Sequence, residues 1–431
     1  MKRHLRLAGL VAGLAIVAAA CSGNTASTAP STAPSTAPST AASTAPSTAP
    51  STAATLKGDL TIWHAYGSGA GTEPNALNEA LFKIAGSVNG VANPGAENPD
   101  LNITVVSVAF NDLYNKYNAD AATGGGPDMF IAPNDSLGFQ AREGVILKLD
   151  DQLTGKLDGK TPTSVAGSKV EGSLYMIPES LKAVALFYDS ASLATPPATT
   201  DALLAGVKDG SIKAGFFGGN NGVYHNFGWW AAFGGALMDS SGKCIASTTG
   251  VPDAYKYLVS LQTAGAKFYP NYDDMANAFK AGDLNLIVDG PWATGGYKPK
   301  VAGVKSAPMP AGPSGPAQPL AGVDGWYINP ATKDVPLAVA FGLRMTAEDI
   351  EQIFVDKAGH IPANTANTIT DPITKGFADA VATGYPRPQI KQLDNFWGNF
   401  GNAQQKILET GADPVTAITE ACAAMDKANG L

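Results

Sequence analysis

Segments typical of β-strands alternate with amphipathic helical segments from Asp59 onward. The first five expected elements alternate between strand and helix in the order 59–66, 74–87, 102–110, 111–123 and 128–133. Strands separated by helices predict βαβ units and a mostly parallel sheet. Because ligands bind beyond the carboxyl ends of such strands, the loops 64–73 and 133–137 are candidate site loops.

The same alternation continues through the rest of the chain. Further strands are expected at 183–189, at 284–292 and from 325, and further helices at 253–267, at 338–359 and from 414. Asp413 followed by Pro414 is typical of a helix N-cap with proline at the first helical position. About 375 residues follow the N-terminal region described next, enough for two α/β lobes with separate cores.

The first 20 residues have the pattern of a secretory signal peptide. A basic start precedes an apolar run at 7–20, which is shorter than the roughly 20 residues that span a bilayer. Three alanines directly precede Cys21, an arrangement that resembles a bacterial lipobox. We therefore expect export and lipidation of Cys21, with ordinary signal cleavage and a free cysteine as the alternative.

Residues 21–56 are expected to form a tether. A Ser-Thr-Ala-Pro unit repeats there without a charged or large apolar side chain between 25 and 54. Such a segment buries too little surface to offset its ordering entropy. Its proline density favours extended polyproline conformation, which reaches at most about 100 Å at 3.1 Å per residue. That length suits a spacer between a membrane anchor and a folded domain.

Charge and motif content exclude several classes of function. The net charge of −8 falls to −11 once the three basic residues of the signal are removed, and no basic cluster stands against it. This argues against nucleic acid and against peripheral binding to anionic lipid. The chain has no His-Glu-x-x-His, Gly-x-Ser-x-Gly, P-loop or Cys-x-x-Cys motif, so we expect no metal, no cofactor and no enzyme. A glycoside hydrolase stays as an alternative, because its two carboxylates need not be close in sequence.

Two cysteines remain in the exported part of the chain, Cys244 and Cys422. In an oxidising compartment they could form a disulfide. The alternative is two unrelated buried thiols.

Four segments in order resemble the family-1 extracellular solute-binding proteins, near the maltodextrin-binding branch: 121–151, 175–189, 288–297 and 394–421. The resemblance implies a periplasmic-binding-protein-like fold of two α/β lobes, each a mostly parallel sheet flanked by helices. Three crossovers would fall near 180–183, 321–325 and 365–375. Lobe 1 would comprise 57–181 and 324–368, and lobe 2 would comprise 183–321 and 372–431. Both cysteines then lie in lobe 2, which supports the disulfide.

The resemblance also implies a function. Such a protein captures an extracellular sugar in the cleft between its lobes and delivers it to an ABC permease in the membrane. Closure about the hinge would be driven by a ligand that touches both lobes only in the closed form. We expect a monomer, anchored to the outer face of the cell membrane through Cys21.

Sugar recognition needs aromatic platforms and paired polar groups. The family's platforms correspond to Trp292, Trp397 and Tyr224, although each ring could instead belong to the core. Asp135 matches a carboxylate that accepts hydroxyl hydrogens, or else it caps a turn. The remaining candidates are Asn134 beside it, His64 and Tyr66 in the first loop, and Lys182 near the hinge.

The chain departs from the maltodextrin pattern in several places. Gly67-Ser68 replaces an acid–lysine pair, Ala132 replaces a platform tryptophan, and Ser136 and Gly401 replace arginines. These losses argue against long maltodextrins. A polyol phosphate or organic anion is the alternative ligand class, and it would need cations converging on the cleft. Three more tryptophans are expected in the core or on a lobe surface: Trp229, Trp230 and Trp326.

Overall fold

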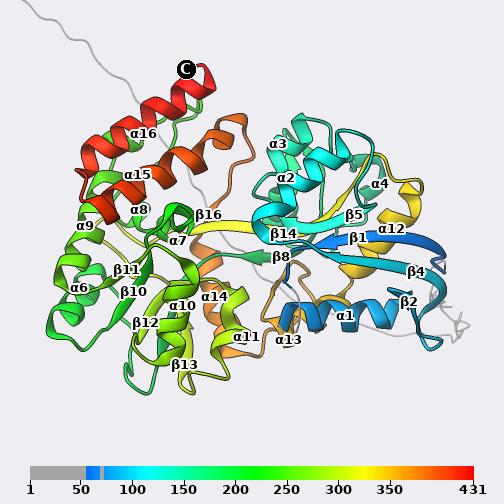
Figure 1. The fold of residues 1–431 in the computed structure, drawn as a ribbon, viewed down its shortest axis with the longest axis horizontal. Helices are drawn as coiled ribbons and strands as arrows, with labels where there is room; N and C mark the ends of the chain where they lie inside the picture. Colours follow the sequence, from blue (N-terminus) through cyan, green and yellow to red (C-terminus); the bar gives the residue numbers. More distant parts are fainter. Residues whose placement is uncertain (1–54, 68–71) are drawn as a thin grey trace, which may run out of the picture. The chain divides into compact units, whose positions relative to one another are not determined.

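The computed structural model describes residues 55–67 and 72–431 (Figure 1). The expected signal peptide, the lipidation of Cys21 and nearly all of the tether lie outside these residues and stay predictions. No helix in the described part of the chain is both long and apolar enough to cross a membrane.

The first sheet is mixed. Strands β4, β1 and β5 pair in parallel, and β14, β8 and β15 continue the sheet with antiparallel pairing. Its strands are β1 (Gly58–His64), β2 (Ala85–Val88), β3 (Val91–Ala92), β4 (Asn98–Ser107), β5 (Met129–Pro133), β8 (Ile177–Lys182), β14 (Leu320–Ile328), β15 (Ile361–Pro362) and β16 (Tyr385–Pro386).

The second sheet is also mixed, in the order β11-β10-β12-β9-β13. Its strands are β9 (Ala185–Asp189), β10 (Ala214–Phe217), β11 (Lys267–Tyr269), β12 (Leu286–Asp289) and β13 (Val304–Ala307). Two sheets within an α/β chain confirm the expected α/β class, but the expectation that each sheet is mostly parallel is wrong, because half of the strand pairs in each are antiparallel. Parallel pairing is confined to β11-β10-β12 in this sheet, because β9 enters it antiparallel to both neighbours. A small hairpin, β6 (Lys169–Val170) and β7 (Ser173–Leu174), stands apart.

Helices surround each sheet. Figure 1 shows α1 beside α13 below the first sheet, and α15 beside α16 near the second. The first set comprises α1 (Thr72–Ile84), α2 (Phe110–Ala121), α3 (Leu137–Arg142), α4 (Asp150–Leu153), α5 (Pro162–Gly167), α12 (Val335–Met345) and α13 (Glu348–Ala358). The second comprises α6 (Thr200–Asp209), α7 (Val223–Asn226), α8 (Gly228–Ala232), α9 (Val251–Ala264), α10 (Tyr272–Ala281), α11 (Thr294–Tyr297), α14 (Pro372–Thr383), α15 (Phe396–Thr410) and α16 (Pro414–Asn429). Short 3-10 turns are η1 (Asn220–Gly222), η2 (Ala246–Thr248), η3 (Pro291–Ala293) and η4 (Lys391–Asn395).

Two expected helices differ from the structure, one by a break and the other because its last residues form part of a strand. The helix expected at 338–359 is two helices, because Ala347 is extended (φ −74°, ψ 155°) and redirects the chain so that α13 packs on α1. The helix expected at 74–87 ends at Ile84, and the next four residues form β2 beside β4. A Cβ at Gly86 would lie 2.0 Å from the Pro99 carbonyl oxygen, so only glycine permits this close approach. The predicted cap is confirmed, since the Asp413 carboxylate accepts the Thr416 N–H at 2.9 Å.

Three apolar clusters form the core. One lies under the first sheet and one under the second. The third includes Phe130 of β5 and Phe187 of β9, so apolar packing continues from one sheet to the other. The chain runs from a strand of one sheet to a strand of the other at 183–184 and at 308–319, and after α14 it returns to β16, which pairs with β14 of the first sheet. The lobe bounds stay a prediction.

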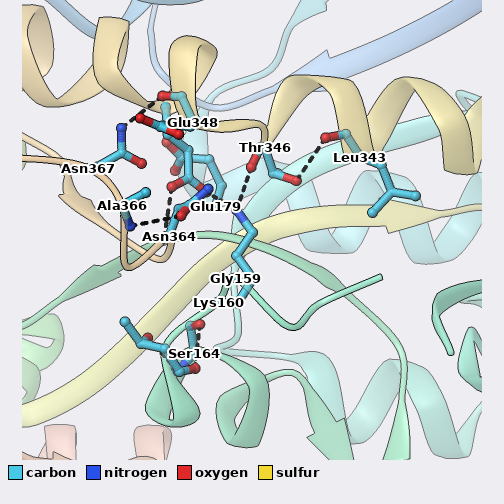
Figure 2. Close-up of polar contacts among 12 residues, drawn as sticks. Gly159, Lys160, Ser164, Glu179, Leu343, Thr346, Glu348, Asn364, Ala366 and Asn367 are labelled. Carbon is cyan, nitrogen blue, oxygen red and sulfur yellow. Dashed lines mark hydrogen bonds and ion pairs between the residues drawn. The ribbon is translucent and has the colours of Figure 1, made fainter. Parts of the chain in front are cut away.

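A buried polar network lies between the turn before α5 and the segment after β15 (Figure 2). Lys160 forms an ion pair with Glu351, and their side chains are 6% and 1% exposed. Lys160 Nζ also donates to the Thr346 carbonyl oxygen at 2.5 Å, and the second Glu351 oxygen accepts the Asn364 N–H at 2.9 Å. A buried ion pair is tolerated when further hydrogen bonds satisfy its remaining groups, as they do here. The network ties the turn before α5 to α13 and to the segment after β15.

A disulfide joins Cys244 to Cys422 of α16, with their Cα atoms 5.4 Å apart. The Cys244 N–H donates to the Asp426 carboxylate at 2.8 Å on the same helix. The bond links positions 178 residues apart within the second core.

Candidate functional site

Three aromatic rings predicted from the sequence lie near one another. Tyr224 of α7 and Trp292 of η3 have ring centres 6.2 Å apart at an angle of 38°. Trp397, at the start of α15, and Tyr224 both lie near the Arg387 guanidinium. Each ring packs against the second core while keeping part of its surface exposed. Tyr224, Trp292 and Trp397 are called the ring cluster below.

Arg387 connects the ring cluster to the first sheet. Its guanidinium carbon lies 5.5 Å from the ring centres of both Tyr224 and Trp397. The same group forms an ion pair with Asp135 in the loop after β5 and donates to Asn134 Oδ1 at 3.0 Å. Its side chain is only 1% exposed. This burial lowers the pKa of Arg387 to about 10, which leaves the guanidinium charged at neutral pH.

A second ion pair lies next to the first. Lys182 Nζ, at the end of β8, is 2.9 Å from an Asp324 carboxylate oxygen and 5.7 Å from the Trp292 ring centre. Gly322 of β14 separates the two cations: a Cβ there would lie 3.4 Å from both Arg387 Nη2 and Lys182 Cγ. The arrangement therefore places two neutralised cation–acid pairs beside three aromatic rings.

The Asn134 side chain hydrogen-bonds with other residues of the protein. It is 1% exposed, its amide nitrogen donates to the Gly167 carbonyl at 2.9 Å, and its oxygen accepts from Val323 and Arg387. The expectation from sequence was a ligand contact. In the structure the Asn134 amide hydrogen-bonds with Gly167, Val323 and Arg387, and the ligand contact stays a prediction.

His64 and Tyr66 contact residues of the first lobe. His64 is 6% exposed, and burial lowers its pKa to about 4, so its ring is neutral. Its Nδ1 accepts the Tyr66 N–H at 3.2 Å. Besides His64, the Tyr66 ring contacts Phe354 and His360, with centres 6.3 and 5.9 Å apart. In the described residues both side chains thus pack into the first lobe.

A cavity of about 460 Å³ opens at the passages between the sheets, lined by residues such as Leu181, Ala321, Ile361 and Val381. Its lining has no aromatic or charged side chain. It therefore lacks the aromatic faces that stack on a sugar, and the ring cluster is the better candidate site.

Arg387 was missed by the sequence reasoning. The only local signal is a cation between two prolines, in Tyr385-Pro386-Arg387-Pro388, shortly before Trp397. The three tryptophans expected in the core or on a lobe surface are buried, with exposures of 0% for Trp229 and Trp326 and 1% for Trp230.

Comparison with known proteins places this geometry in context. Residues 91–378 match the family model described as bacterial extracellular solute-binding protein. The maltodextrin-binding protein MdxE of Bacillus subtilis is 25% identical over 326 residues, which cover 69% of this chain and 76% of that protein. The maltotriose-binding protein of Pyrococcus abyssi is 26% identical over 397 residues, covering 84% of this chain and 80% of that one. The structure of the Thermus thermophilus maltotriose binding protein bound with maltotriose is similar with a TM-score of 0.73 and 25% identity, over 86% of this chain and all of that one.

Proposed function

The chain belongs to the family of bacterial extracellular solute-binding proteins, and from this premise we propose that it captures an extracellular sugar for an ABC importer. The observation that carries the proposal is the ring cluster beside two ion pairs. Sugars present apolar C–H faces that stack on aromatic rings, and hydroxyls that bond with planar polar groups. Trp292, Trp397 and Tyr224 supply the faces.

The ion pairs supply the hydroxyl partners. Asp135 and Asp324 can accept hydroxyl hydrogens, while Arg387 and Lys182 can donate to hydroxyl oxygens. Because each cation already has a carboxylate partner, the site carries no net charge from these four groups. This balance favours an uncharged ligand.

The relatives support a glucose oligomer as the first ligand class to test, since two of them are named for maltodextrin and maltotriose. Three positions where the maltodextrin-binding branch has larger ligand-contacting residues hold small ones here: Ala132, Ser136 and Gly401. These losses favour a short oligomer such as maltotriose over long chains.

The proposed mechanism is capture by closure. Asp135 comes from the loop after β5, and the rings come from elements of the second sheet, so one ligand between them would touch both lobes. Binding would shift the population toward the closed form, which the permease would recognise. No bond of the sugar has to break, so we propose a binding protein rather than an enzyme. Export, anchoring through Cys21 and a monomeric state belong to the same proposal.

The convergence of Arg387 and Lys182 favours a second candidate class, a small anion such as a polyol phosphate or organic anion. An anion would have to separate each cation from its aspartate, which makes this class the weaker one.

Calorimetric titration with maltose, maltotriose, glycerol 3-phosphate and citrate tests these alternatives. We expect binding of a neutral sugar, and loss of that binding in Trp292→Ala and Trp397→Ala. Phe110→Ala is the matched control, because Phe110 is an aromatic side chain on α2 that is 46% exposed. Binding of the anions alone would support the second candidate, and sugar binding that survives both tryptophan changes would show that the site lies elsewhere.

A further inference from the structure

A fully buried carboxylate lies beside Trp292. Asp289 is the last residue of β12 and is 0% exposed. Its oxygens accept hydrogen bonds from Tyr297 Oη at 2.5 Å, from the Gly290 N–H at 2.7 Å and from Tyr272 Oη at 3.0 Å. A buried charge requires such partners, and Asp289 has three.

Tyr272 links Asp289 to Trp292 through two hydrogen bonds. The Trp292 indole nitrogen lies 3.0 Å from Tyr272 Oη. An indole N–H can only donate, so Tyr272 Oη is the acceptor there, and its own hydrogen points to Asp289. The bonds therefore run in one direction, from Trp292 through Tyr272 to Asp289. Burial and the Asp289 charge raise the pKa of Tyr272 well above its usual value, which keeps this hydroxyl protonated.

Two further neighbours limit the Trp292 ring, which stays partly exposed. A Cβ at Gly290 would lie 2.0 Å from Trp292 Cη2, so the ring lies directly on the glycine backbone. His225 meets the ring edge-on, with centres 6.1 Å apart and planes at 85°. His225 is 6% exposed, and its Nε2 is 3.5 Å from Asp289 Oδ1. The indole is thus held by packing and by one directional hydrogen bond.

We propose that Asp289 is a positioning residue for ligand binding, which acts through Tyr272 to hold the Trp292 indole in the orientation that stacks on the sugar. A ring fixed before binding loses little freedom when the ligand arrives, so its stacking contributes more to affinity. This inference rests on the proposed function, because it takes Trp292 as a sugar platform.

Tyr272→Phe is the principal test, since it keeps the ring and removes the hydroxyl oxygen that accepts the Trp292 indole N–H. We expect about a tenfold loss of maltotriose affinity, the effect of one buried hydrogen bond. Asp289→Asn should cause a similar or larger loss. Tyr297→Phe is the matched control, because Tyr297 also donates to Asp289 but makes no hydrogen bond to Trp292. That control should lower thermal stability and leave affinity within about twofold of the wild type.

A double-mutant cycle tests whether Tyr272 acts through Trp292. Trp292→Phe keeps an aromatic platform without the N–H. If Tyr272 acts only through that group, adding Tyr272→Phe to Trp292→Phe should cost less than about twofold in affinity. A tenfold loss in both backgrounds would overturn the inference and indicate direct contact between Tyr272 and the ligand.

A readout without ligand separates this inference from the proposed function. Subtracting the near-ultraviolet circular dichroism spectrum of Trp292→Phe from that of the wild type gives the contribution of Trp292. Tyr272→Phe and Asp289→Asn should weaken that signal strongly, and Tyr297→Phe should preserve it. An unchanged signal in a folded Tyr272→Phe variant would refute the positioning role even if sugar binds. If no sugar binds the wild type, the proposed function fails, and a lost signal still supports the positioning role.

Discussion

His360 Nδ1 lies 3.0 Å from a Glu179 carboxylate oxygen in the interior of the first lobe. Its Nε2 lies 3.2 Å from Glu73 in the first turn of α1, so one imidazole bridges two carboxylates. Burial lowers the pKa of His360, but the charges of Glu179 and Glu73 outweigh burial and leave that pKa well above its usual value. Burial raises the pKa of Glu179, but His360, together with the Ser180 hydrogen bond and the Lys160 charge, outweighs burial and leaves that pKa lowered.

This bridge predicts a pH-dependent contribution to stability. Because the folded pKa of His360 is raised above its unfolded value of 6.5, the contribution is full below about pH 6.5 and falls as pH rises through the folded pKa. The lowered pKa of Glu179 keeps its own contribution full above about pH 4.5. His360→Gln should therefore cost about 3 kcal/mol at pH 5.5 and less at pH 9. Urea unfolding at both pH values measures the difference, and equal losses at the two would contradict the bridge.

His64 predicts the opposite dependence in a lower pH range. Burial lowers its folded pKa to about 4, whereas the unfolded value is 6.5, so the unfolded chain binds more protons between these values. Stability should therefore fall by about 3 kcal/mol as pH drops from 7 to 4, through this one group. Comparison of wild type with His64→Gln by urea unfolding isolates the effect. The variant should show a shallower decline, and parallel declines would show that His64 is not buried in the neutral form.

The Lys160–Glu351 pair predicts a stability effect without an effect on binding. Lys160→Met removes the cation and leaves Glu351 buried without its partner. Because burial raises the pKa of Glu351 to about 8, the loss should be about 3–5 kcal/mol at pH 9, where the carboxylate is charged, and smaller at pH 7. Lys148→Met is the matched control, because Lys148 is 58% exposed in its pair with Asp150 and should change stability by less than about 1 kcal/mol. Thermal unfolding measures both, and maltotriose affinity should stay unchanged. Similar stabilities for the two variants would argue that the buried pair is not formed.

Arg387 predicts an effect on ligand binding. Lysine lacks the planar fork that contacts Asp135, Asn134 and two aromatic rings at once, so Arg387→Lys should weaken sugar affinity at least tenfold. Arg344→Lys is the control, since Arg344 pairs with Glu97 and Asp349 and is 23% exposed. Calorimetric titration with maltotriose measures both variants. If Arg387→Lys bound maltotriose as tightly as the wild type, Arg387 would not contribute to ligand binding.

The disulfide predicts an effect on stability alone. Replacing both Cys244 and Cys422 by serine should lower the free energy of unfolding by about 2–5 kcal/mol, chiefly because the unfolded chain regains freedom. Sugar affinity should be preserved, because both residues lie in the second core rather than at the ring cluster. Mass spectrometry with and without reductant checks the bond, and a free thiol on either cysteine in the oxidised protein would contradict it.

The sequence by itself determined the α/β class, the order of most elements and the identity of the aromatic rings. These features follow from local patterns: strand and helix periods, caps and turns near in sequence. The resemblance added the likeness to known binding proteins, and with it the role expected of Trp292, Trp397 and Tyr224.

Only the tertiary structure decided which charged side chains meet. Arg387 and Asp135 are 252 residues apart in sequence, and no local pattern pairs them. The same holds for the partners of Asp289 and of His360. It also decided that Asn134 is used internally and that β8 and β14 join the first sheet antiparallel. Such contacts depend on how the two sheets are connected and packed, and a buried charge is stable only where the assembled fold brings a partner to it.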